Sequence, residues 1–192
     1  MPRLGPPSCA RCGAPTAWPV QRCSECAGRR VAFDSAQAAV PYTAPVREAV
    51  RAWKERGLRR FAPVAAELVV QRVPRPAADV ITYIPPDGDR SVKRGHQPAR
   101  DLAEGLGERW SLPVSGLLER MRPVAQQTTL SRADRRRNVR GAFGVARATA
   151  PPAVVLVDDV FTTGATVGAA SAALRAAGAQ RIVVITFARA TR

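Results

Sequence analysis

The sequence predicts an α/β protein, in which helices cover both faces of a mostly parallel sheet and a small cysteine-bearing appendage precedes it. From about residue 31 onward, short apolar runs alternate with segments of helical periodicity. Residues 1–30 differ because they hold all four cysteines, several prolines and glycines, and little periodicity. We therefore divide the chain into an appendage, residues 1–30, and a main domain, residues 31–192.

Three amphipathic segments predict the helices of the first half of the main domain. Pro45 opens the first, in which the apolar residues up to Trp53 fall on one face. Residues 61–69 and 102–110 show the same spacing of apolar side chains. A short strand over residues 79–84 lies between these last two helices and ends at a pair of prolines.

The last part of the chain predicts two buried strands with a helix between them. The first strand, residues 153–157, is entirely apolar and leads into two adjacent aspartates. A helix of small residues follows over 165–177 and ends at Gly178. The second strand covers residues 181–187. Because parallel neighbours are normally connected through a helix, these elements extend the same sheet.

Length, charge and composition limit the class of protein. With 192 residues, 46% of them apolar, the chain can bury a core and is not expected to be disordered. No apolar run approaches the ~18 residues of a membrane helix, and the first residues lack the apolar region of a signal peptide, so we expect a cytoplasmic protein without membrane insertion. The net charge of +15 favours an anionic partner, although a coding bias would also explain the choice of arginine over lysine.

The four cysteines form two Cys-x-x-Cys pairs separated by ten residues. Each pair can place two thiolates on one metal ion, and together they complete a tetrahedral zinc site. The alternatives are two disulfides, which the missing secretory signal disfavours, or a redox motif, which needs only one such pair. Four protein ligands leave no open position, so the predicted role is structural. The predicted ligands are Cys9, Cys12, Cys23 and Cys26.

The segment that follows the strand at 153–157 predicts a ligand site. In a parallel sheet, ligands bind beyond the carboxyl ends of the strands, which is where we expect Asp158 and Asp159. Residues 162–166, Thr-Thr-Gly-Ala-Thr, begin a helix whose free N–H groups can bind a phosphate. A phosphate site with carboxylates beside it suits a ribose 5-phosphate, because the ribose hydroxyls can donate hydrogen bonds to the carboxylates. The alternative is an ordinary strand–loop–helix connection without a ligand, in which the aspartates cap backbone N–H groups and the threonines are exposed to solvent.

This segment resembles the motif that binds phosphoribosyl diphosphate (PRPP) in type I phosphoribosyltransferases, where two acids precede TTGxT. The resemblance implies the type I phosphoribosyltransferase fold and Mg²⁺ bound together with PRPP. It assigns ribose contacts to Asp158 and Asp159. The phosphate contacts that it assigns are Thr162, Thr163, Gly164, Ala165 and Thr166.

Other parts of the chain are similar to the ComF family of competence-associated proteins. The paired cysteines resemble its zinc finger, residues 42–57 resemble its Y-x-G-P-V-R-E…A-F-K-Y-R-G segment, and residues 120–143 resemble R…Q-x-x-L-S…R-x-x-N-V-x-G-A-F. This resemblance implies a role in DNA uptake during natural competence, with phosphoribosyl transfer to an unknown acceptor as the activity. The alternative is a non-catalytic module on the same scaffold that binds single-stranded DNA and a competence motor ATPase.

A polar loop over residues 88–97 carries Lys93 and Arg94. In a phosphoribosyltransferase, a basic loop closes over the pyrophosphate and stabilises the leaving group. We therefore assign this role to both side chains, with a solvated loop as the alternative. Pro86 and residues 96–98 depart from the family pattern on this side of the expected ligand.

Arginines spaced four apart occupy one face of a short predicted helix that begins after Ser131. Such a face can bind the phosphates of single-stranded DNA or an acidic partner protein. The alternative is a charged face in solvent, and the low aromatic content, 5%, weakens a base-stacking groove. The residues of this predicted surface are Arg132, Arg136 and Arg140.

Two further polar residues stand out by their rarity. Lys54 is one of two lysines in an arginine-rich chain and falls on a position of the ComF resemblance. His96 is the single histidine, and a lone histidine more often forms a local hydrogen bond than acts as a general base. We expect a functional contact from Lys54 and a local hydrogen bond from His96.

Overall fold

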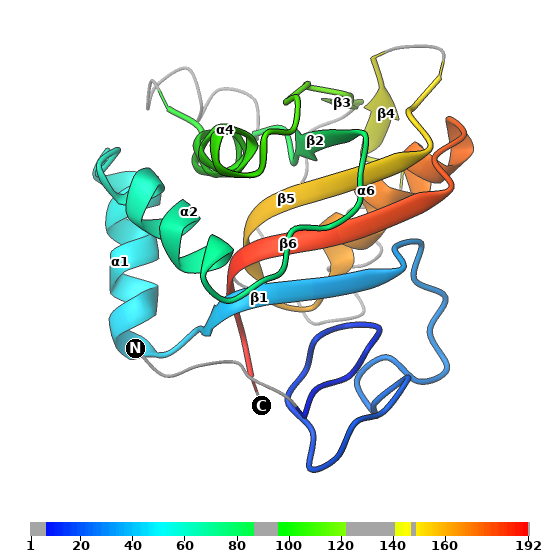
Figure 1. Ribbon diagram of the computed structural model, residues 1–192, viewed down its shortest axis with the longest axis horizontal. Helices are drawn as coiled ribbons and strands as arrows, with labels where there is room; N and C mark the ends of the chain where they lie inside the picture. The colour runs from blue at the N-terminus through cyan, green and yellow to red at the C-terminus, as the bar shows by residue number, and fades with distance from the viewer. Residues whose placement is uncertain (1–6, 87–95, 122–140, 147–148, 192) are drawn as a thin grey trace.

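The computed structural model describes residues 7–86, 96–121, 141–146 and 149–191. Its main sheet has the strand order β1-β6-β5-β2, and every neighbouring pair is parallel (Figure 1). These strands are β1 Ser35–Pro41, β2 Val80–Tyr83, β5 Ala153–Phe161 and β6 Arg181–Arg189. A separate antiparallel ribbon pairs β3 Leu118–Arg120 with β4 Phe143–Val145.

The helices divide between the two faces of this sheet. Alternate residues of β5 belong to two different cores. Val154 and Leu156 pack toward α6, while Val155 and Val157 pack toward the other helices. Figure 1 shows α6 behind the sheet. The described helices are α1 Ala44–Glu55, α2 Phe61–Val70, α4 Pro98–Trp110 and α6 Ala165–Ala176. The predicted class, a parallel α/β sheet covered on both faces, is confirmed.

Two strand ends differ from the sequence prediction. The strand predicted to stop at residue 157 continues to Phe161, and its neighbour β6 continues to Arg189. The reason is that the two strands pair with each other to the last residue, Phe161 opposite Arg189. Strand β2 ends earlier, with Tyr83 opposite Val157. The predicted arginine-rich helix, and Lys93 and Arg94 of the predicted polar loop, fall outside the described residues.

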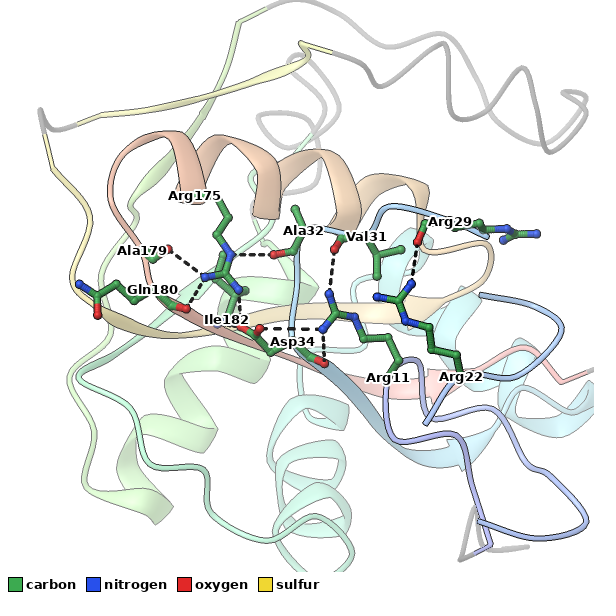
Figure 2. A network of polar contacts seen from close by, with 10 residues as sticks. All are labelled: Arg11, Arg22, Arg29, Val31, Ala32, Asp34, Arg175, Ala179, Gln180 and Ile182. Carbon is green, nitrogen blue, oxygen red and sulfur yellow. Dashed lines mark hydrogen bonds and ion pairs between the residues drawn. The ribbon is translucent and has the colours of Figure 1, made fainter. Parts of the chain in front are cut away.

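The appendage packs against the main domain on the α6 face. Arg11 donates to the carbonyl oxygens of Val31 and Asp34, at 3.0 Å and 3.2 Å, and Arg175 of α6 forms an ion pair with Asp34 at 2.5 Å (Figure 2). Gly13 has a φ of +69°, and a Cβ there would overlap the carbonyl oxygen of Ala36 in β1. Polar contacts and a tight backbone approach therefore hold the appendage in place.

No helix within the described ranges combines the length and the apolar content that a bilayer crossing requires.

Candidate functional site

The candidate site begins where β5 extends beyond β2. After Val157, β5 keeps a described strand neighbour only on the β6 side. Asp158 and Asp159 follow at this point, and the N–H of Asp159 donates to Oδ1 of Asp158 at 2.9 Å. Because adjacent side chains on a strand point to opposite sides, the two carboxylates have different surroundings. The predicted edge of the sheet thus carries both acids, although they lie inside the strand rather than after it.

Asp159 forms an ion pair that connects β5 to α1. Its Oδ2 lies 2.5 Å from Nζ of Lys54, and the side chains are 8% and 39% exposed, respectively. Lys54 occupies the last turn of α1, where a cation is favoured by the helix dipole. Nearby, Nε2 of the buried His96 lies 2.5 Å from the carbonyl oxygen of Trp53, which is the local hydrogen bond predicted for this histidine. Lys54 therefore does contact one of the predicted site residues.

The Lys54 contact leads to a test of stability. Lys54→Met keeps most of the packing but leaves the nearly buried carboxylate of Asp159 without this cation, so we expect the free energy of unfolding to fall by about 1–3 kcal/mol. The measurement is urea denaturation at neutral pH. The matched control is Arg51→Met, which breaks the exposed pair with Glu55 on the same helix and should cost less than about 1 kcal/mol. Equal losses in both variants would contradict the assigned role of Lys54.

Asp158 shares a small hollow with the loop that leads into α6. Gly164 caps this helix with a φ of +72°, and a Cβ there would lie 2.7 Å from the Phe161 ring. Glycine is therefore required by both the backbone conformation and the space. Thr163 Oγ1 accepts from the N–H of Ala165 at 3.3 Å, which tightens the turn. The hollow is lined by Asp158, Val160, Phe161, Thr162, Gly164, Ala165, Thr166 and Val167.

The start of α6 has the electrostatic character of an anion site. Its first turn contains no acidic side chain, and its N-cap residue is a glycine, so no negative charge within the helix neutralises the positive end of the helix dipole. Five predicted phosphate contacts, residues 162–166, form this turn and its approach. The structure thus brings Asp158 and four of the five predicted phosphate contacts into one hollow, whose lining includes neither Thr163 nor Asp159.

The turn after β2 lies on the predicted pyrophosphate side of the site. Nε of Arg120 in β3 donates to the carbonyl oxygens of Pro85 and Pro86, at 3.1 Å and 3.0 Å. The Arg120 guanidinium also lies over the Phe143 ring, 5.0 Å from its centroid. The β3–β4 ribbon therefore holds this turn in place. The predicted pyrophosphate contacts of the next segment lie outside the described residues.

The four cysteines of the appendage converge on one point. Their Sγ atoms all lie within 4.8 Å of one another, including Cys9 to Cys26 at 3.6 Å and Cys12 to Cys23 at 3.5 Å. A tetrahedral zinc ion with Zn–S bonds of about 2.3 Å requires sulfur–sulfur distances of about 3.8 Å, so the set fits this metal. None of these cysteines forms a disulfide. The predicted cluster is therefore present and has the spacing of a structural metal site.

Hydrogen bonds favour the thiolate form of one of these cysteines. Burial alone would raise the pKa of Cys9, but backbone N–H groups, including those of Cys12 and Cys23, lower it to about 7. Burial raises the pKa of Cys12 and of Cys26. A bound cation would favour the thiolate form at all of these positions, because metal ligation requires the deprotonated sulfur.

Arg189 connects the cysteine cluster to the phosphate loop, and its role could not be assigned from sequence. Its side chain is 2% exposed, and it donates from Nη1 to the carbonyl oxygen of Cys12 at 2.6 Å and from Nη2 to Glu25 at 3.1 Å. Its guanidinium lies 4.4 Å from the centroid of the Phe161 ring. Because Phe161 also packs under Gly164, Arg189 joins the two predicted sites through direct contacts. Arg189 stands beyond the strand that the sequence predicted over residues 181–187, so no pattern in the sequence indicated its role.

Comparison with curated proteins gives relatives that align along nearly the whole chain. Competence protein F of Haemophilus influenzae is 28% identical over 195 residues, which cover 96% of this chain and 85% of the relative. DNA utilization protein YhgH of Salmonella typhi is 29% identical over 192 residues, which cover 94% of this chain and 83% of the relative. No protein-family model matches the chain.

Among solved structures, similarity covers about two thirds of this chain. One, described as glutamine phosphoribosylpyrophosphate amidotransferase from B. subtilis complexed with ADP and GMP, is 27% identical over 66% of this chain, with a TM-score of 0.41. Another, described as the allosteric regulatory enzyme of purine biosynthesis, is 26% identical over 67% of this chain, with a TM-score of 0.46. In both cases the match spans 25% of the solved chain.

Proposed function

This chain is a relative of the ComF competence proteins, and we propose that it binds PRPP or a ribose 5-phosphate together with Mg²⁺ at the end of β5. The observation that carries this proposal is the single hollow that Asp158 shares with the Gly164 loop at the start of α6. A phosphate suits the N–H groups of that helix start, and a ribose beside it offers hydroxyls to a carboxylate.

Each predicted residue has a distinct role in this proposal. The loop over residues 162–166 holds the 5-phosphate, while Asp158 and Asp159 accept hydrogen bonds from the ribose hydroxyls. Lys93 and Arg94 neutralise charge on the departing pyrophosphate if transfer takes place. Mg²⁺, when bound with PRPP, supplies further neutralisation of the pyrophosphate oxygens.

The names of the relatives support a role in the uptake and use of DNA. The net charge of +15 gives the chain a positive field that attracts nucleic acid. The second candidate function is therefore a non-catalytic module that binds single-stranded DNA and a competence motor ATPase, with the surface of Arg132, Arg136 and Arg140 as a contact. The cysteine cluster, with structural zinc, would support either function by fixing the appendage.

One pair of titrations distinguishes these functions. In calorimetry with Mg²⁺, we expect PRPP and ribose 5-phosphate to bind the full chain with a stoichiometry of one, and inorganic pyrophosphate to be released from PRPP only if a suitable acceptor is present. Absence of binding by both sugar phosphates would overturn the first proposal. Affinity for single-stranded DNA should fall steeply with added salt if the second holds, because phosphate contacts release counterions. Affinity independent of salt would overturn that candidate.

A further inference from the structure

A cavity of about 420 Å³ lies between the appendage and α6. Cys12 and Cys26 line one part of it and residues 163–165 another, but most of its lining belongs to neither the cysteine cluster nor the predicted phosphate loop. Its volume falls within the range of about 300–1,000 Å³ that is usual for small-molecule sites. It is formed by both parts of the chain, which is a common position for ligand sites. The lining residues that define its chemistry are Arg29, Arg30, Phe33, Phe161, Gly168 and Arg189.

The walls of the cavity suit a flat, apolar group. The rings of Phe33 and Phe161 meet edge to face, with centroids 6.1 Å apart and an interplanar angle of 83°. Gly168 of α6 also lines the cavity, and a Cβ built there would meet no heavy atom within 4 Å. The wall formed by α6 is therefore recessed at this turn. The two rings are 1% and 6% exposed, so they form an apolar floor beside this recess, which favours an aromatic ligand over a fully polar one.

The charges around the cavity favour an anion. Glu25 is neutralised by Arg189, which leaves Arg29 and Arg30 without an acidic partner among the described residues. Figure 2 shows the Arg29 side chain extended away from the network of Arg11 and Arg175. In addition, Nε of the buried Arg189 has no hydrogen-bond partner in the described part of the chain. The cavity thus carries an excess of positive charge and an unused buried donor on its lining.

We propose that this cavity binds a small aromatic anion, with its ring against Phe33 and Phe161 and its acidic group at Arg29 and Arg30. The site is distinct from the ribose-phosphate hollow, although Phe161, Gly164 and Ala165 contribute to the lining of both. An occupant would therefore contact the same loop that is proposed to hold the 5-phosphate. The proposal does not depend on PRPP binding, because it rests on a different cavity and different charged residues.

The test uses the fluorescent aromatic sulfonate 8-anilinonaphthalene-1-sulfonate as a probe of the full, metal-loaded chain. We expect one probe molecule per chain. Gly168→Leu places a side chain in the recess without a clash at Cβ and raises helix propensity, so the fold should be retained while affinity falls at least about tenfold. The matched control is Ala176→Leu, which adds the same side chain to an exposed position of α6 outside the cavity and should leave affinity unchanged.

A second comparison tests the role of charge. Arg29→Ala together with Arg30→Ala should weaken the sulfonate probe at least about tenfold, but should leave the neutral analogue N-phenyl-1-naphthylamine unaffected. Arg60→Ala together with Arg181→Ala removes the same net charge from exposed positions outside the cavity and serves as the control. Equal weakening by the two pairs would show general electrostatic attraction and would overturn the proposal.

Competition separates this site from the ribose-phosphate site. Ribose 5-phosphate is expected not to displace the probe one for one, whether or not it binds the chain. Direct displacement would place the probe in the phosphate hollow and contradict the proposal. Unchanged probe affinity in Gly168→Leu would also contradict it, since the recess would then be unused.

Discussion

Replacing Asp158 and Asp159 together with alanine is expected to abolish measurable binding of PRPP and of ribose 5-phosphate. Both carboxylates are proposed to accept hydrogen bonds from ribose hydroxyls, and hydrogen bonds to charged groups contribute about 1.5–3 kcal/mol each. Loss of both therefore corresponds to a decrease in affinity of about 100-fold or more. Calorimetry in the presence of Mg²⁺ measures this decrease directly.

The control for this variant must match both its charge and its effect on stability. Glu48→Ala together with Glu104→Ala removes two negative charges from exposed positions on α1 and α4, and should bind ribose 5-phosphate like the unmodified chain. Asp158→Ala alone spares the ion pair between Asp159 and Lys54, so it separates ligand binding from stability. Unchanged affinity in the double aspartate variant, with the fold intact, would remove these residues from the proposed site.

Removal of the metal is expected to have the largest effect on the appendage. A structural zinc site contributes on the order of 10 kcal/mol to the folding of a small unit at neutral pH. Among residues 7–30 of the appendage, the buried apolar residues are three of the cysteines and Ala14. A strong chelator should therefore release one zinc ion per chain and expose the appendage to trypsin at Arg22, Arg29 and Arg30. The measurement combines metal analysis with limited proteolysis followed by mass spectrometry.

The rest of the chain provides an internal control for metal removal. One of the two cores of the sheet, the one under α1, α2 and α4, contains no residue of the appendage, so most of the circular dichroism signal should remain while the appendage is cleaved. The appendage should become resistant to trypsin again when zinc is added back. Well under one metal ion per chain in the purified protein, or equal proteolysis with and without chelator, would contradict a structural metal site.

Loss of the metal should also loosen the packing of the predicted phosphate loop, for a reason that is visible only in the structure. Arg189 depends on Cys12 and Glu25 of the appendage for its hydrogen bonds, and it stacks on Phe161 beneath Gly164. Residues 12 and 189 are separated by 177 positions, so no local pattern could predict their contact. The same holds for Lys54 and Asp159, which belong to different elements and meet only through packing of α1 beside the sheet.

Local patterns predicted the helices and the longer buried strands because each repeats an apolar spacing over many residues. The sequence analysis missed strand β1 because three of its seven residues are alanine, which has a low β propensity. The segment is a strand because it forms parallel backbone hydrogen bonds with β6. Strands β3 and β4 are three residues each and too short to show alternation. The candidate metal ligands and the candidate phosphate loop could be proposed from the sequence because the residues of each set lie close together along the chain.

The most direct test of the central claim is a crystal structure of the full chain with ribose 5-phosphate and Mg²⁺. The proposal predicts a phosphate on the N–H groups at the start of α6, around Gly164, with the ribose hydroxyls within hydrogen-bond distance of Asp158 or Asp159. A ribose 5-phosphate bound elsewhere, such as in the cavity beside Arg29 and Arg30, or no bound sugar phosphate at saturating concentration, would contradict the account.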